Sequence, residues 1–210
     1  MFSKPLTWLS FAVLAGVVLL ALLAQRALFG TRAGESAVTP TPGLAADIVI
    51  PPESMPASDF TLHDQDGKAV SVSAFRGQVV AITFLDSHCK QLCPLEADQL
   101  AQAQRALGTA AKLTVLVVSV APATDTPESE RAFALMHHWT GEWHWLIGAP
   151  EQLAAVWKAY SIAVQGTPDN VLHSTVLYLV DKQGFQRAGW ASGLQPDQLA
   201  RDVRFLDSAA

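Results

Sequence analysis

The chain has 210 residues, a formal net charge of −5 and a hydrophobic content of 50%. This length suffices for one compact domain with some additional chain. The mild charge, without blocks of like sign, gives no indication of a nucleic-acid or acidic partner, and two cysteines are too few for a scaffold built on many disulfides.

The N-terminus contains a long uncharged run, since 21 residues separate Lys4 from Arg26. Roughly 20 apolar residues cross a bilayer as a helix, and no A-x-A-like cleavage site follows. Residues 1–29 are therefore predicted to be a transmembrane anchor, with a cleaved signal as the alternative. The flanking charges are nearly balanced. We expect a single-pass protein of the cytoplasmic (inner) membrane whose domain faces the periplasm or another extracytoplasmic space.

Residues 30–58 contain five prolines and lack helical periodicity, which predicts a semi-extended linker. The folded domain is predicted over 59–210. It opens with alternating apolar and polar residues on both sides of Asp66-Gly67, a strong signal for a β-hairpin.

The elements expected next alternate between buried strands and amphipathic helices. Continuous apolar runs predict strands buried on both faces, and Pro and acidic residues near the start of a segment predict helix N-termini. The strands are expected at 78–85, 112–120 and 142–148, the helices at 94–108, 126–139 and 149–162, followed by a hairpin over 175–190 and a closing helix over 194–207. This order predicts an α/β fold, a thioredoxin-like mixed sheet flanked by helices with an N-terminal β-hairpin.

Both cysteines, Cys89 and Cys93, lie between a buried strand and a helix. Open α/β sheets place their ligands at this position, and the partial positive charge of a helix N-terminus favours thiolate over thiol. Three interpretations remain open: a structural disulfide, a redox pair and a clamp for a soft metal ion. The disulfide would close a very short loop and would stabilise little.

His173 is expected beside the cysteines, because it lies at the mouth of the predicted 175–190 hairpin. Oxidoreductases of the thioredoxin type carry a cis-proline near this place, but here no proline lies between Pro168 and the strand. Two thiolates and one imidazole suit copper(I), because soft thiolates select it. A single histidine before a strand is also commonly only a loop residue.

The chain resembles the Sco (SenC) family of membrane-anchored, thioredoxin-fold copper proteins that help assemble the copper centre of cytochrome c oxidase. The resemblance covers roughly residues 59–207. It is carried by the C-x-x-x-C-P motif at 89–94, by "SVAPATDTPE" at 119–128 and by "HSTVLYLVDKQG" at 173–184.

The resemblance implies that Cys89, Cys93 and His173 bind copper, as Cu(I) and possibly Cu(II). It further implies delivery of Cu(I) to subunit II of cytochrome c oxidase or to another copper or thiol acceptor. The alternative function is a thiol-disulfide oxidoreductase that keeps acceptor cysteines reduced, with Cys89 and Cys93 as the catalytic pair.

The sequence departs from the family pattern at three positions. Lys90 replaces a proline, and Ala121 and Leu172 replace aspartates. Because acids near a metal site orient its histidine ligands, these departures make Cu(II) binding less expected than Cu(I) binding. His88 is considered as a further ligand and Asp86 as a hydrogen-bond acceptor near the cysteines.

Overall fold

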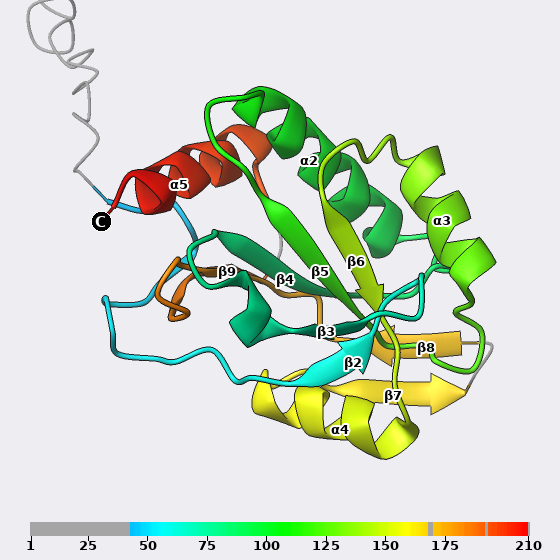
Figure 1. Cartoon of the computed structure of the whole chain (residues 1–210). Coiled ribbons are helices and arrows are strands. Elements are labelled where there is room, and N and C mark those ends of the chain that lie inside the picture. The colour runs from blue at the N-terminus through cyan, green and yellow to red at the C-terminus, as the bar shows by residue number, and fades with distance from the viewer. Residues whose placement is uncertain (1–42, 168–169, 192, 210) are drawn as a thin grey trace, which may run out of the picture. The chain divides into compact units, whose positions relative to one another are not determined.

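The computed structural model describes residues 43–167, 170–191 and 193–209 (Figure 1). The predicted anchor lies outside these residues. Within the described ranges, none of the helices combines the length and the apolar character needed to cross a membrane.

A six-stranded mixed sheet forms the centre of the domain, in the order β1-β10-β9-β4-β5-β6. Strands β4, β5 and β6 are parallel, whereas β9 pairs antiparallel with β4, and β10 with β9. Every residue of β4 and β5 is buried, as expected for a parallel sheet covered on both faces. The bounds are β1 Ile48–Val49, β4 Val80–Leu85, β5 Thr114–Ser119, β6 Trp143–Leu146, β9 Leu177–Val180 and β10 Gln186–Trp190.

Helices cover both faces of this sheet (Figure 1). Side chains of α2 (Leu92–Leu107), α3 (Pro127–Met136) and α5 (Pro196–Ser208) contribute to one hydrophobic core. A second core on the opposite face includes α4 (Pro150–Ala159), the β2–β3 hairpin (Thr61–His63 and Ala69–Ser71) and a 3-10 helix, η1 (Val72–Phe75). The expected mixed sheet with helices on both faces is confirmed.

Local signals explain where the helices begin and end. The Thr126 side chain accepts a hydrogen bond from the backbone N–H of Ser129, which completes a capping box at the start of α3. Helix α2 ends at Gly108, whose φ of 55° lies in the left-handed region that glycine adopts without steric cost.

Two strand pairings were not predicted. A second small sheet, β7 (Val164–Thr167) with β8 (Asn170–His173), precedes β9. Its residues alternate only weakly and largely face solvent, so periodicity does not reveal it. Strand β1 lies in the segment expected to be a linker. Its two exposed residues pair with β10, a contact that depends on a distant part of the chain.

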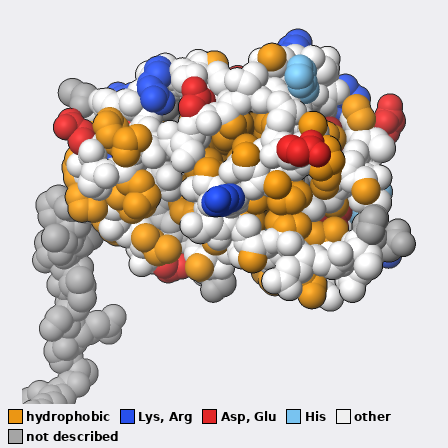
Figure 2. All heavy atoms as spheres, turned by 90° about the horizontal axis from the view of Figure 1, so that it is seen from below, with side chains coloured by type: hydrophobic (Ala, Val, Ile, Leu, Met, Phe, Trp, Pro, Cys, Tyr) orange, Lys and Arg blue, Asp and Glu red, His pale blue; other side chains and the backbone are white. Residues whose placement is uncertain are grey.

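Figure 2 shows the face that lies at the bottom of Figure 1. In Figure 1, α4 and β7 are the labelled elements closest to this face. Hydrophobic side chains gather over this face, with few charged side chains between them. A groove of about 240 Å³ is lined by residues of β7, β8 and the segment after β5, including Val120, Val164 and Val171. The hairpin that carries His173 thus packs beside the segment that follows β5.

Candidate metal centre

The two cysteines lie at the point where strand β4 passes into helix α2. Cys89 is in the connecting turn and partly buried, and its backbone N–H donates to the Asp86 carbonyl at 3.2 Å. Cys93 is the second residue of α2 and only 2% exposed. Neither cysteine is part of a disulfide. The turn therefore presents one accessible and one buried sulfur at the carboxyl end of the central sheet.

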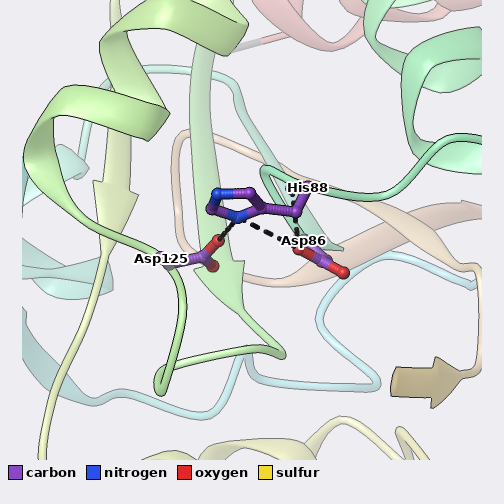
Figure 3. A group of neighbouring side chains, drawn as sticks. All are labelled: Asp86, His88 and Asp125. Carbon is purple, nitrogen blue, oxygen red and sulfur yellow. Dashed lines mark hydrogen bonds and ion pairs between the residues drawn. The ribbon is translucent and has the colours of Figure 1, made fainter. Parts of the chain in front are cut away.

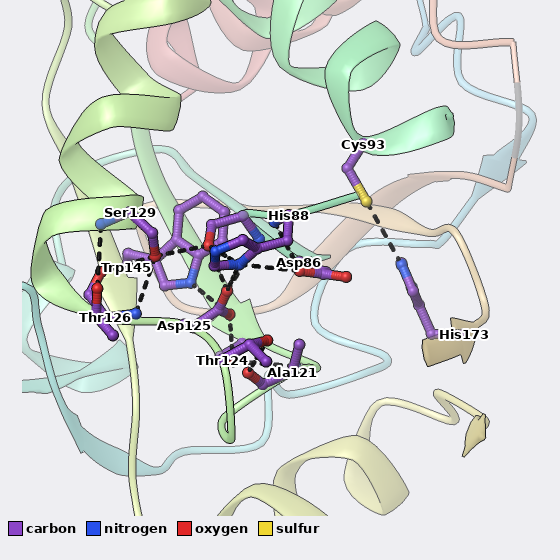
Figure 4. A network of polar contacts seen from close by, with 12 residues as sticks. Asp86, His88, Cys93, Ala121, Thr124, Asp125, Thr126, Ser129, Trp145 and His173 are labelled. Atoms are coloured by element: carbon purple, nitrogen blue, oxygen red, sulfur yellow. Dashed lines mark hydrogen bonds and ion pairs between the residues drawn. The ribbon is translucent and has the colours of Figure 1, made fainter. Parts of the chain in front are cut away.

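His173 is brought to the cysteines by the β7–β8 hairpin. It is the last residue of β8, and its Nε2 lies 3.6 Å from the Cys93 Sγ (Figure 4). The predicted proximity to the cysteines is observed, although the strand that carries His173 belongs to the smaller sheet rather than to the 175–190 hairpin. Three groups separated by up to 84 positions in the chain therefore meet at one end of the domain.

The tautomer of His173 follows from the contact made by its other ring nitrogen, Nδ1. Its Nδ1 lies 3.0 Å from the backbone carbonyl oxygen of Ser174. A carbonyl only accepts, so Nδ1 carries the proton and donates it, and the lone pair remains on Nε2. The lone pair is thus on the nitrogen that faces Cys93, which is the arrangement that a metal-ligating imidazole requires.

The pKa values of the Cys89 and Cys93 thiols are shifted in opposite directions. The Cys93 thiol donates a hydrogen bond to Cys89, and this bond, together with backbone N–H groups of Gln91 and Cys93, lowers the pKa of Cys89 to about 5 despite partial burial. The same hydrogen bond, followed by burial, raises the pKa of Cys93. At neutral pH the pair therefore holds one proton, on Cys93, and one accessible thiolate, on Cys89.

The donor atoms fit a soft metal ion. With the bond lengths of zinc sites as a guide, about 2.3 Å to sulfur and 2.0 Å to nitrogen, donors of a three-coordinate site are roughly 3.7 Å apart. The observed distance of 3.6 Å between Cys93 Sγ and His173 Nε2 is close to this value. Two sulfurs and one imidazole are donors that favour copper(I) over harder ions.

Neither of the two residues that replace aspartates, Ala121 and Leu172, can accept a hydrogen bond from His173 through its side chain. Ala121 is buried, with 2% exposure, and cannot accept a side-chain hydrogen bond, whereas Leu172 is 64% exposed. The imidazole of His173 is instead oriented by the Ser174 carbonyl. The absence of the two aspartates suggested that nothing orients the imidazole of His173, but a backbone carbonyl orients it instead.

Sequence reasoning missed one buried polar group beside the cysteines. Asp125, which directly precedes the helix predicted at 126–139, has no side-chain exposure and accepts hydrogen bonds from Ser87, Ser119 and Trp145. Burial raises its pKa, and the bonds from Ser119 and Ser87 oppose this rise. The order of the elements could have revealed this contact. Ser87 and Asp125 follow neighbouring parallel strands, whose carboxyl ends meet at one edge of the sheet.

A second buried acid lies one helical turn after Cys93. Glu96 is 5% exposed and accepts a hydrogen bond from the Thr83 hydroxyl of β4. Burial raises its pKa to about 7, and the Thr83 bond opposes this rise. Because an ionised Glu96 also raises the pKa of Cys93, a protonated Glu96 makes loss of the Cys93 proton less costly.

A protein-family model matches most of this chain. The SCO1/SenC model matches residues 51–206, well over half of the chain. The chain belongs to the SCO1/SenC family. The match extends from the segment before the β2–β3 hairpin into the last turn of α5, so it includes both cysteines and His173.

Relatives of known structure share the fold of this SCO1/SenC protein. It is similar to ScoI of Arabidopsis thaliana with copper bound (26% identity, TM-score 0.64, 70% of this chain and 95% of that one). It is also similar to copper-bound ScoI of Bradyrhizobium japonicum (27% identity, TM-score 0.63, 71% and 98%). Among curated proteins, the bovine mitochondrial SCO2 homolog is 29% identical over 159 residues, which is 70% of this chain and 58% of that protein. The chain thus spans less than two thirds of the bovine protein.

Proposed function

We propose that this protein binds copper(I) between Cys89, Cys93 and His173 and transfers it to an acceptor protein. The observation that carries the proposal is the orientation of His173, whose Nδ1 is committed to a carbonyl while Nε2 faces the Cys93 sulfur at 3.6 Å. The copper-bound ScoI structures of two relatives support it.

The two sulfurs have different roles in this proposal. Cys89 is partly exposed and already a thiolate, so it is the ligand that meets copper(I) first and that an acceptor thiolate displaces first. Cys93 is buried and releases its proton when the ion binds. His173 supplies a neutral third ligand. Stepwise ligand exchange then transfers copper(I) to the acceptor without releasing the ion into solvent.

The acceptor in this proposal is subunit II of cytochrome c oxidase during assembly of its copper centre, or another copper or thiol protein. The domain would act outside the cytoplasm, tethered by residues 1–29 through the linker at 30–58. The uncharged N-terminal run and the mitochondrial names of relatives support a membrane-associated location.

Anaerobic titration with copper(I) against a competing chelator tests the site. His173→Ala should weaken copper(I) affinity by at least about 10–100-fold, the range for loss of a supporting interaction, with little change in folding. His88→Ala is the matched control, because the His88 side chain is 54% exposed and its Nδ1 faces Ser87 and two carboxylates. A large loss in His88→Ala with none in His173→Ala would show that the third ligand is misassigned.

One observation favours a second function, thiol-disulfide exchange. An accessible cysteine beside a buried one is the arrangement in which the first attacks a disulfide and the second resolves the mixed disulfide. In that reaction the Cys89 thiolate and the Cys93 thiol form a disulfide and give two electrons and one proton to the acceptor disulfide, which takes its second proton from water and becomes two thiols. Reduction of insulin at a rate typical of thioredoxins would favour this function over copper transfer.

A further inference from the structure

The turn that carries Cys89 is fastened to the buried carboxylate of Asp125. Its Oδ1 accepts from the Ser87 backbone N–H at 2.9 Å and from the Ser87 hydroxyl at 2.6 Å. Its Oδ2 accepts from the Ser119 hydroxyl at 2.6 Å. The same oxygen accepts from the Trp145 indole N–H at 3.2 Å, and Figure 4 shows Trp145 beside Asp125. A carboxylate offers about four acceptor positions, and all four are in use.

Asp86, His88 and Asp125 lie close enough to resemble a metal site, with one donor atom of each within 4.8 Å of the others (Figure 3). Their hydrogen bonds indicate a different role. Asp125 has no free acceptor position, and Asp86 Oδ1 accepts the His88 backbone N–H at 2.8 Å. Asp125 and Asp86 therefore hold the turn through the backbone N–H groups of Ser87 and His88 rather than forming a second metal site.

Cys89 differs from the other two proposed ligands in how it is held. Cys93 is part of α2, and His173 is part of β8 and bonded to the Ser174 carbonyl. Cys89 belongs to neither a helix nor a strand. Its position depends on the turn, and the turn is tied to the body of the domain at Ser87, two residues earlier.

We propose that Asp125 is a positioning residue for metal binding: through Ser87 it sets the distance of the Cys89 sulfur from Cys93 and His173. This inference rests on the proposed function. Asp125 touches neither the ion nor its ligands in this role. It acts by holding two donors of Ser87 on one oxygen, while the other oxygen is anchored to the buried Ser119 and Trp145.

Asp125→Asn tests this role with little change of shape. The Ser87 backbone N–H and the Trp145 indole N–H can only donate, and they bind opposite oxygens. Whichever way the amide is turned, its NH₂ group faces one of these donors. With copper(I) as the probe and the full chain in detergent, the variant should bind about 10–100-fold more weakly.

Two serine variants separate positioning from stability. Ser87→Ala removes a donor on the cysteine side and should weaken copper(I) binding at least several-fold, whereas Ser87→Thr, which keeps the hydroxyl, should restore it. Ser119→Ala removes a donor from the other oxygen. It should lower the unfolding midpoint while changing copper(I) affinity less than Ser87→Ala does. Equal losses of affinity in Ser87→Ala and Ser119→Ala, or unchanged affinity in Asp125→Asn, would overturn the proposal.

A metal-free measurement separates this inference from the proposed function. In a glutathione buffer, the Cys89 thiolate and the Cys93 thiol form a disulfide and pass two electrons and one proton to oxidised glutathione, which takes a second proton from water and becomes two molecules of reduced glutathione. If Asp125 positions Cys89, Asp125→Asn should shift this equilibrium by a factor similar to its effect on copper(I) affinity. A parent chain that binds copper(I) only weakly would refute the proposed function, and the disulfide equilibrium would still decide the role of Asp125: an equilibrium equal to that of the parent overturns it.

Discussion

A buried carboxyl group on α3 should make the stability of the protein depend on pH. Glu130 is 0% exposed, and neither of its oxygens has a hydrogen-bond partner within the described part of the chain. Burial, followed by the nearby Asp125, raises the pKa of Glu130 from 4.5 to about 8. The folded protein therefore keeps this proton over a pH range in which the unfolded chain has released it.

The sign and size of the effect follow from this difference. Below pH 4.5 both states hold the proton and there is no penalty. As pH rises from 4.5 to about 8, only the unfolded chain ionises, so the free energy of unfolding falls, and above about pH 8 the loss is complete. Each pH unit in this window is worth about 1.4 kcal/mol, so the total loss is at most about 5 kcal/mol.

Urea unfolding followed by tryptophan fluorescence measures the effect in pairs of variants. Glu130→Gln removes the titration, so between pH 5 and pH 7 the wild type should lose about 2–3 kcal/mol relative to this variant. Glu128→Gln, exposed on the same helix, serves as the control and should follow the wild type. If the difference between wild type and Glu130→Gln is the same at both pH values, the carboxyl group is not held protonated and the reasoning is refuted.

Further predictions concern the surface, the sheet edge and the tether. Leu95 is 54% exposed on the turn of α2 after Cys93, where an acceptor protein would approach the cysteines. Leu95→Glu should therefore slow copper transfer without weakening copper binding. Leu135→Glu on α3 is the control and should change neither. Asp202 accepts the Ala45 backbone N–H at 2.7 and 2.8 Å, so Asp202→Ala should cost about 1–3 kcal/mol and expose the segment at 43–57 to proteolysis; unchanged cleavage would contradict this. A protein anchored by 1–29 should resist carbonate extraction, and a mature N-terminus within 25–35 would indicate a cleaved signal instead.

Much of the fold could be predicted from the sequence, because its signals are local. The continuous apolar runs of β4 and β5, the turn at Asp66-Gly67 and the Thr126 cap each depend on a few neighbouring residues. Periodicity and capping act within one element, so they predict its type and place. The C-x-x-x-C spacing likewise indicated a reactive or metal-binding pair at the start of a helix.

The tertiary structure alone decided how the site is built. The element order predicted His173 beside the cysteines, but only the tertiary structure shows that β8 carries it, and that its Nε2 lies 3.6 Å from the Cys93 Sγ, because the hairpin alternates only weakly. The carbonyl that orients His173 is a backbone atom, and every residue has one. In the sequence Asp125 is an ordinary residue before a helix, and only the parallel pairing of β4 and β5 brings it within hydrogen-bond distance of Ser87. Such contacts depend on how distant segments pack, and periodicity within a segment carries no information about that packing.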